Sequence, residues 1–419
     1  MSGSAALRPR LLFLSQTLPF PPDGGVNIRT YHTLRLLAEE FDITALCFYR
    51  RQDRSSRAAV DAAIAGLRGF ARLEAFAIPQ EYQRLRYLRD HASSVVRRRA
   101  YTVDAYASKA FRARLESLLA RDDFALVHVD SLDLAGYLPL LTGLPVVCTH
   151  HNVESQLLRR RGQLERAPWR RAYLAWQAER VEDLERTWCP RVALNITVSE
   201  ADREELSRRA PGARFVVVPN GVDTAGFRPE QGREDGLVYV GGANWFPNRD
   251  ALAHFCEDIL PLLRRGREHV AVRWVGRVSD DDRRRSAARY DIELPGYVED
   301  VRPYIKDAAC YIVPLRVGGG TRLKILDAWA MGKAVVSTAV GCEGLTAVDG
   351  ENILVRDSAP AFAEAVRAVI ANGDLRERLG RRGRETVERL YDWEVIRPRL
   401  LDAYRSVVGA GCESTTLDA

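Results

Sequence analysis

Short apolar runs alternate with amphipathic stretches along the first half of the chain. The apolar runs are rich in aliphatic residues and occupy residues 11–15, 43–49, 125–130, 145–150 and 194–199. Runs of this length are typical of strands that are buried on both faces of a parallel sheet. Helical periodicity separates them, for example over residues 29–40 and 111–120. Strands alternating with helices predict right-handed crossovers and a doubly wound α/β domain.

A second series of apolar runs predicts a second α/β domain. These runs occupy residues 215–219, 237–241, 271–276, 309–314, 334–338 and 352–355. We predict an N-terminal domain over 1–200, a hinge or linker over 201–222 and a C-terminal domain over 223–392. The last helical pattern, 393–408, is expected to pack back on the first domain, and 409–419 to form a flexible tail. Two such sheets joined by a hinge predict a central cleft lined by strand-to-helix loops.

The composition is that of a globular protein, because 46% of the 419 residues are hydrophobic and 28% are charged, which excludes wholesale disorder. No apolar run approaches the roughly 20 residues of a membrane-spanning helix. The N-terminal apolar run is short and has no small-residue cleavage site, so we expect no signal peptide. Seven scattered cysteines favour reduced thiols over a disulfide or zinc framework. These features predict a cytoplasmic protein.

The net charge of +6 is concentrated in the first half of the chain. Residues 1–200 hold 29 basic and 22 acidic side chains, against 33 and 34 in residues 201–419. Residues 82–114 hold nine basic and two acidic side chains among aromatic and aliphatic residues, and 159–176 mixes arginine with tryptophan and tyrosine. These mixtures suit an anionic membrane surface or a lipid phosphate; an ordinary solvated helix face is the alternative. No recognition motif accompanies them, so we expect no nucleic-acid partner.

The sharpest local feature is a glycine turn, residues 318–320, between an apolar strand and a helix. Glycines let backbone N–H groups approach an anion, and the new helix adds its unsatisfied donors. Arg322 and Lys324 place cations in the first turn, which the helix dipole disfavours by roughly 0.3–1 kcal/mol. Asp327 is placed to accept hydrogen bonds from ribose hydroxyls. The pattern predicts a phosphate-binding loop; a glycine turn that merely starts a packed helix is the alternative.

Three motifs, taken in order, resemble those of the GT-B glycosyltransferases of the retaining family 4. Residues 219–223, Pro-Asn-Gly-Val-Asp, are similar to the family's hinge motif. Residues 294–300 fit its turn beside the nucleotide base, and residues 318–333 resemble its donor-binding motif. The resemblance covers nearly the whole chain. It implies two Rossmann-like domains facing a cleft, the N-terminal one binding the acceptor and the C-terminal one the nucleotide-sugar.

The resemblance also implies a donor site, with two departures from the family pattern. The implied donor-binding residues are Gly24, Gly25, Gly242, Asn244, Tyr297, Val298, Gly318, Gly319, Gly320, Thr321 and Asp327. Of two glutamates that the donor motif usually carries, the first is replaced by Gly319 and the second is shortened to Asp327. The Arg and Lys that often hold the diphosphate are missing from 241–248, as in a subset with Pro-Asn here and Gly-Gly-Gly-Thr-Arg-Leu-Lys later. We hypothesise that Arg322 and Lys324 supply the lost positive charge.

The acceptor side is implied in the first domain, where residues 19–29 form a Pro/Gly-rich turn after the first strand. By resemblance this turn faces the acceptor and the donor phosphates. Gly24 and Gly25 permit close approach, and Arg29 is a candidate phosphate contact. A plain Pro/Gly turn that needs no ligand is the alternative.

The strand at 145–150 ends in a second candidate group for the acceptor side. The family's sugar-contacting histidine is carried over to His151, with His150 as a second candidate and Asn152 beside them. A structural histidine at a strand end is the alternative reading. The histidine pair lacks further ligands at metal spacing, so zinc is not expected.

The implied activity is transfer of a hexose from a UDP- or GDP-sugar to a hydroxyl with retention, in polysaccharide, glycolipid or glycoconjugate synthesis. His151, Arg322 and Lys324 are the candidate catalytic residues. The acceptor would be a sugar, a lipid-linked or a small molecule, and the enzyme would work without metal or cofactor, either free or peripherally on the inner face of the membrane. A nucleotide-sugar 2-epimerase and a noncatalytic GT-B module that binds a nucleotide or partner are the alternatives.

Overall fold

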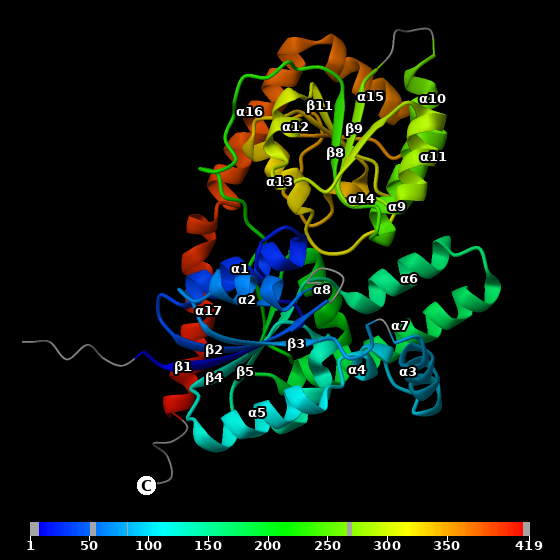
Figure 1. Ribbon diagram of the computed structural model, residues 1–419. Coiled ribbons are helices and arrows are strands. Elements are labelled where there is room, and N and C mark those ends of the chain that lie inside the picture. Colours follow the sequence, from blue (N-terminus) through cyan, green and yellow to red (C-terminus); the bar gives the residue numbers. More distant parts are fainter. Residues whose placement is uncertain (1–7, 51–55, 82, 266–269, 414–419) are drawn as a thin grey trace, which may run out of the picture. The chain divides into compact units, whose positions relative to one another are not determined.

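The computed structural model describes residues 8–50, 56–81, 83–265 and 270–413. The chain forms two compact units, Met1–Val218 with Arg397–Ala419, and Pro219–Ile396. Each unit contains its own parallel sheet covered by helices (Figure 1). We call them unit 1 and unit 2.

Unit 1 is built on a seven-stranded parallel sheet of order β3-β2-β1-β4-β5-β6-β7. The strands are β1 (Arg10–Ser15), β2 (Asp42–Tyr49), β3 (Arg72–Ala77), β4 (Leu126–Val129), β5 (Val146–His150), β6 (Leu194–Thr197) and β7 (Phe215–Val217). The inner strands are buried on both faces, as their continuous apolar runs predict. Phe48 of β2 stacks on Phe111 at a centroid distance of 4.5 Å and anchors the core on one face.

Helices link these strands as crossovers. They are α1 (Gly25–Leu37), α2 (Arg57–Ala65), α3 (Arg84–Val96), α4 (Tyr101–Ala105), α5 (Lys109–Arg121), η1 (Leu132–Leu140), α6 (Glu154–Leu164), α7 (Pro168–Trp188), η2 (Cys189–Arg191) and α8 (Glu200–Arg209). The helix expected over 29–40 begins four residues earlier and ends at Leu37. Residue 82 of the basic segment 82–114 lies outside the described residues.

The boundary between the two units differs from the prediction. Strand β7 pairs with β6 in the first sheet, with Asn195 opposite Phe215, so the expectation that 215–219 opens the second sheet is wrong. Most of the predicted linker also belongs to unit 1, because α8 is the crossover that connects these two parallel strands. Parallel strands need a connection of about a dozen residues, and the polar segment 201–214 provides it.

Unit 2 contains a six-stranded parallel sheet of order β10-β9-β8-β11-β12-β13. Its strands are β8 (Leu237–Val240), β9 (Val272–Val275), β10 (Glu293–Gly296), β11 (Cys310–Val313), β12 (Val335–Ser337) and β13 (Leu354–Val355). Its helical elements are α9 (Phe246–His254), the π-helical turn η3 (Phe255–Ile259), α10 (Leu260–Leu263), α11 (Asp280–Tyr290), α12 (Arg302–Asp307), α13 (Leu323–Ala330), α14 (Ala339–Cys342), α15 (Ala359–Ala371) and α16 (Gly373–Leu390).

Two buried tryptophans organise the core of unit 2. Trp274 of β9 stacks on Tyr239 of β8 at 3.8 Å between ring centroids. Trp329 of α13 donates its indole N–H to the carbonyl of Asn352 at 2.8 Å. A Cβ at Gly383 of α16 would lie 2.8 Å from Cγ of Trp329, so only glycine lets the two helices approach this closely. This packing fixes α13, which carries Lys324 and Asp327.

The last helix, α17 (Trp393–Glu413), joins the two units in sequence. From Arg397 onward it belongs to unit 1, where Arg397 pairs with Glu39 at 2.9 Å and Arg405 pairs with Glu40. Tyr404 is buried, and its hydroxyl lies 2.6 Å from Nδ1 of His128. The helix continues beyond the expected end at 408, and residues 414–419 of the predicted tail lie outside the described residues.

The side chains of six cysteines are described, and all six are buried free thiols: Cys47, Cys148, Cys189, Cys256, Cys310 and Cys342. Among the helices that the structure describes, none is both long and apolar enough to cross a membrane.

The contact between Tyr404 and His128 gives a stability test of the α17 docking. Burial lowers the pKa of His128, which favours the neutral ring. In that form Nδ1 can accept a hydrogen bond from the Tyr404 hydroxyl while Nε2 faces Asp130. We expect Tyr404→Phe to lower the free energy of unfolding by about 1–3 kcal/mol, because a buried ring nitrogen loses its donor. Urea denaturation measures the loss, with exposed Val395→Ala on the same helix as the control. Equal stability of the two variants would contradict the prediction.

Candidate functional site

The predicted donor residues of unit 2 lie where its parallel strands end. Gly241 and Gly242 follow β8, Tyr297 follows β10, and the glycine loop 318–320 follows β11. Because all these strands are parallel, their carboxyl ends meet at one edge of the sheet, where ligands bind in open α/β folds.

Lys324, in the first turn of α13, reaches across to the loop after β8. Its ammonium donates to Oδ1 of Asn248 at 2.9 Å and to the hydroxyl of Tyr239, and lies 4.0 Å from the Tyr239 ring centroid. A Cβ at Gly241 would lie 2.7 Å from this ammonium. The cation of Lys324 therefore lies against the very loop from which the expected Arg and Lys are missing.

Asn248 connects the β8 loop to this ammonium. Its Nδ2 donates to the carbonyl of Gly242 at 2.9 Å, and its Oδ1 also accepts from the Tyr239 hydroxyl at 2.6 Å. Pro247 in the first turn of α9 favours the start of that helix, which places Asn248 one residue later. The Pro-Asn pair thus has a structural explanation: it holds a lysine that comes from a different element.

The electrostatics of this region disfavour charge on both of its titratable groups. Burial lowers the pKa of Lys324 well below its ordinary value, and the charge of Arg322 lowers it further. Burial raises the pKa of Asp327 to about 7, although Lys324 opposes this shift. Strongly perturbed groups of this kind cluster at functional sites. An anion bound beside Lys324 would favour its charged form.

Arg322 is placed differently from Lys324. Its guanidinium is buried and donates to the carbonyls of Gly319, Gly320 and Val340, the last two at 2.6 and 3.1 Å. The side chain also packs over Gly318. Arg322 therefore stabilises the shape of the glycine loop through these backbone carbonyls, and its guanidinium also lies 3.8 Å from the carboxylate of Glu343. Thr321, between loop and helix, is half-buried.

The remaining donor candidates lie on the β9 and β10 side. Tyr297 is exposed, with the guanidinium of Arg277 4.8 Å from its ring centroid. Backbone atoms of Arg277 lie 3.2 Å from a Cβ position at Gly242, and Oδ1 of Asn244 lies 2.5 Å from the same position. Val298, next to Tyr297, is half-buried. An exposed aromatic ring beside a cation is suited to stacking on a planar base.

In unit 1 a buried carboxylate, Asp130, lies just after β4. Its Oδ2 accepts from the hydroxyls of Ser15 and Thr30 at 3.0 and 2.7 Å. Its Oδ1 lies 3.4 Å from Nε2 of His128 and 3.2 Å from Nε2 of His151. Burial acts to raise the pKa of Asp130, but the two imidazoles outweigh burial, so the pKa lies below its ordinary value.

The acceptor-side candidates His151, Arg29 and Gly24 have different environments in unit 1. His151 is held beside Asp130, whereas Arg29 of α1 is only 1% exposed. Burial lowers the pKa of Arg29 to about 10, opposed by Tyr404 and Asp130, so Arg29 acts inside the unit instead of offering a surface contact. Gly24 caps α1, and among described atoms none lies within 4 Å of its Cβ position. Gly24 therefore borders open space at the first turn of α1, where Gly25 lies.

His150 and Asn152 flank His151 at the end of β5. Nε2 of His150 lies 2.9 Å from Oδ1 of Asn195, and burial lowers the pKa of His150 to about 4. His150 is therefore a neutral, buried residue of the sheet. Asn152 donates to Oε1 of Glu154 at 2.8 Å.

A pocket in unit 1 brings these residues together. Its lining includes Thr102, Leu132, Thr149, His150, Val181, Leu184 and Glu185, together with the polar group Ser131, Asp133, His151, Asn152 and Glu154. Burial raises the pKa of Asp133 to about 6 and, together with the charge of Asp133, that of Glu154 to about 7. The pocket thus offers carboxyl groups that donate or accept hydrogen bonds near neutral pH.

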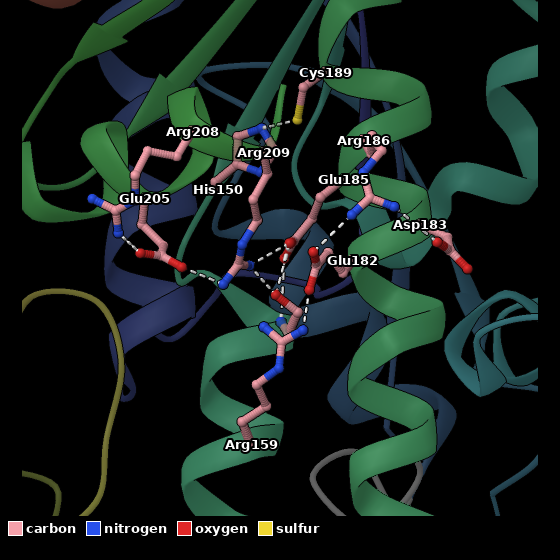
Figure 2. Close-up of polar contacts among 11 residues, drawn as sticks. His150, Arg159, Glu182, Asp183, Glu185, Arg186, Cys189, Glu205, Arg208 and Arg209 are labelled. Atoms are coloured by element: carbon pink, nitrogen blue, oxygen red, sulfur yellow. Dashed lines mark hydrogen bonds and ion pairs between the residues drawn. The ribbon is translucent and has the colours of Figure 1, made fainter. Parts of the chain in front are cut away.

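An ion-pair network that includes the pocket residue Glu185 fixes the start of α6. Glu185 of α7 accepts from the hydroxyl of Ser155 at 2.7 Å and pairs with Arg209 of α8 at 2.6 Å. Figure 2 shows Arg209 between Glu185 and Glu205, and Arg159 reaching Glu182. Since α6 begins at Glu154, this network also positions the carboxyl group of Glu154 in the pocket. Arg159 belongs to the basic segment 159–176, and its charge is paired with Glu182.

Several residues of the site carry no motif in the sequence. Three of them, Asp130, Asp133 and Glu154, follow buried strands. Their place near the carboxyl end of a parallel strand is the one sequence feature that could have indicated a role in the site. The roles of Tyr239 and Arg277 depend on contacts between different elements, which the sequence does not indicate. Across the described chain, no group of three or more His, Cys, Asp or Glu side chains is placed to hold a metal ion.

Two parallel doubly wound units in one chain define the GT-B fold. Sucrose-phosphate synthase from Thermosynechococcus elongatus superimposes with a TM-score of 0.69 at 17% identity, covering 96% of this chain and 100% of that one. Anabaena Alr3699/HepE in complex with UDP-glucose gives 0.66 at 13% identity, covering 95% and 100%.

Two family descriptions match consecutive parts of the chain. Residues 23–225 match Glycosyltransferase Family 4, and residues 234–372 match Glycosyl transferases group 1. The chain belongs to these GT-B glycosyltransferases of group 1 and family 4.

Curated relatives match part of the chain. Phosphatidyl-myo-inositol mannosyltransferase of Mycolicibacterium smegmatis is 28% identical over 225 residues, which is 49% of this chain and 57% of that protein. The lipopolysaccharide core biosynthesis glycosyltransferase LpsE of Rhizobium meliloti is 32% identical over 126 residues, 28% of this chain and 34% of that protein. The chain thus spans less than two thirds of the length of these relatives.

The Asp130 cluster predicts a pH-dependent stability difference. A folded pKa below the ordinary value means that the ionised carboxylate stabilises the fold above the unfolded pKa of about 4, and that this contribution is lost as pH falls toward the folded value. Asp130→Asn should lower the free energy of unfolding by about 3–5 kcal/mol near neutral pH, because it breaks a buried charge cluster.

Urea denaturation at a series of pH values checks this expectation, with exposed Asp123→Asn as the matched control. The gap between wild type and Asp130→Asn should narrow on acidification. A gap that stays constant or widens would contradict the assignment of Asp130 as the ionised centre.

Proposed function

We propose that this protein is a hexosyltransferase that moves a sugar from a nucleotide diphosphate sugar to an acceptor hydroxyl with retention of configuration. The observation that carries the proposal is the ammonium of Lys324 at the Gly241–Gly242 loop, held by Asn248 and Tyr239. That loop lies at the carboxyl end of β8, where a diphosphate would meet backbone N–H groups and a fixed cation. Unit 2 would bind the donor and unit 1 the acceptor.

In the proposed reaction the anomeric C–O bond to the diphosphate breaks, and a bond to the acceptor oxygen forms on the same face. Negative charge grows on the departing diphosphate, which receives the acceptor's proton. Lys324 would stabilise that charge, which lowers the barrier because the cation is already in place. Asp327 would accept hydrogen bonds from donor hydroxyls, and Tyr297 would stack on the base.

Arg322 would support this reaction indirectly. Its guanidinium already donates to Gly319, Gly320 and Val340, so we assign it to shaping the glycine loop whose N–H groups face the donor. This narrows the hypothesis that Arg322 and Lys324 both replace the missing cations: Lys324 is the direct contact.

The acceptor would enter the pocket of unit 1. His151 beside Asp130 and the carboxyl groups of Asp133 and Glu154 are suited to hydrogen bonding with several hydroxyls. Relatives named as a phosphatidyl-myo-inositol mannosyltransferase and as a lipopolysaccharide core biosynthesis glycosyltransferase support a hydroxylated, lipid-linked or saccharide acceptor. Anabaena HepE crystallised with UDP-glucose supports a nucleotide-sugar donor.

A donor screen tests the proposal. Release of nucleotide from UDP- and GDP-sugars is measured with and without glycan or lipid-linked acceptors, and repeated after chelation because we propose a metal-independent reaction. We expect turnover with a restricted set of donors, stimulated by acceptor. Acceptor-independent release of UDP from UDP-N-acetylglucosamine would instead indicate a 2-epimerase, and a folded protein with no turnover on any donor would indicate a noncatalytic module.

Substitutions at Lys324 and at Asn248, which binds its ammonium, should lower kcat to different extents. Lys324→Met should lower kcat by about two to three decades, as removal of a transition-state charge partner does in other enzymes. Asn248→Ala should lower kcat less, because the ammonium remains but loses its fixed position. Lys109→Met, at an exposed lysine of α5, is the matched control. Unchanged kcat and unchanged nucleotide affinity in Lys324→Met would refute its role.

A further inference from the structure

Helix α3 packs on unit 1 through its polar side. Asp90 and Ser94 are buried, and Ser94 accepts a 2.8 Å hydrogen bond from Gln177 of α7. His91 contacts the hydroxyl of Tyr173, also on α7. In Figure 1 α3 lies beside α4 and α7 at the outside of unit 1. The polar, hydrogen-bonding face of α3 therefore points toward the interior of unit 1.

The outward face of α3 is apolar. Leu85, Leu88 and Val96 are 85%, 63% and 82% exposed, and Ala92 and Val95 are exposed with them. The spacing of residues 85, 88, 92, 95 and 96 places these side chains on one side of a helix. A surface helix normally buries such a stripe, so the orientation of α3 is inverted. An exposed contiguous apolar stripe of this kind marks an interaction surface.

Positive charge surrounds the stripe. The two acidic residues of the segment, Asp90 and Asp104, are buried and paired with arginines of the same segment: Arg86 and Arg89 with Asp90, and Arg99 with Asp104. Arg84, Arg97 and Arg98 are exposed at the two ends of the helix, and among the described residues none provides them an acidic partner. The charge that faces solvent here is therefore basic.

An exposed tryptophan lies on α7, close to its contact with α3. Trp169 of α7 is 69% exposed and lies one helical turn before Tyr173, which contacts α3. The guanidinium of Arg170 is 4.9 Å from its ring centroid. Tryptophan and arginine side by side are typical of the boundary between lipid headgroups and acyl chains.

We propose that the outward face of α3, together with Trp169, is a membrane-contact surface that inserts its aliphatic side chains into an anionic leaflet while the arginines bind lipid phosphates. This surface is distinct from the candidate transfer site and does not depend on the proposed reaction. A second copy of the chain is a poor occupant, because arginines at both ends of the stripe would face each other. A single helix of 13 residues also presents far less than the roughly 1,200 Å² of a stable interface.

The test uses the full chain and co-sedimentation with vesicles of phosphatidylcholine alone or mixed with phosphatidylglycerol. We expect binding to the mixed vesicles that weakens with added salt. Leu85→Ser/Leu88→Ser/Val96→Ser should weaken it roughly tenfold or more, because the inserted apolar area is lost. Arg84→Ala/Arg97→Ala/Arg98→Ala should weaken binding to the anionic vesicles alone. Val348→Ser/Val395→Ser, at exposed valines of unit 2, is the matched control.

Circular dichroism and light scattering accompany the assay, since all substituted positions are exposed and the variants are expected to fold. Equal binding of wild type and the leucine/valine variant would overturn the proposal. Wild type that does not bind vesicles but forms a dimer, which the same variant disrupts, would also overturn it and assign the stripe to self-association.

Discussion

A carboxylate removed from water stays ionised only where charges and donors surround it, and unit 1 is arranged to meet this requirement at Asp130. The surrounding groups come from β1, α1, β4 and the end of β5, through Ser15, Thr30, His128 and His151. His128 extends the cluster to Tyr404 of α17. One buried charge therefore links the position of the candidate catalytic histidine to the docking of α17, whose Tyr404 lies 276 residues after His128.

In unit 2, by contrast, the buried ionisable side chain of Lys324 has no oppositely charged partner among its hydrogen bonds to the described residues. Lys324 is held by neutral oxygens of Asn248 and Tyr239, and burial shifts the pKa of Lys324 down and that of Asp327 up. Neutral hydrogen-bond partners fix the position of the Lys324 side chain without compensating a charge on it. In the proposed function an anionic donor would supply that compensation, whereas the partners of Asp130 are all groups of the protein.

Much of the architecture follows from local patterns, because continuous apolar runs and helical periodicity indicate buried parallel strands and crossovers. The strand β7 was assigned to the wrong sheet, since a three-residue run has no local feature that selects its partner. Lys324 was predicted from its charge at a helix start. Asn248 and Tyr239 were not, because their roles depend on pairing between β8, α9 and α13. Arg322 has the same sequence signal as Lys324, and only the contacts of the folded side chains distinguish them: Arg322 bonds the loop backbone next to it, whereas Lys324 reaches Asn248 and Tyr239 on other elements.

Helix α3 illustrates a further limit of periodicity. The spacing of its apolar positions indicates that they share one face, but a period contains no information on whether that face points inward. The direction is decided by Asp90, Ser94 and His91, which find hydrogen-bond partners on α7 or within α3 itself, so that the polar face of the helix points to the interior. Satisfying those buried groups leaves Leu85, Leu88 and Val96 outside. The exposed stripe is thus a consequence of the polar contacts beneath it, and basic side chains flank it because the two acidic residues of the segment 82–114, Asp90 and Asp104, are buried.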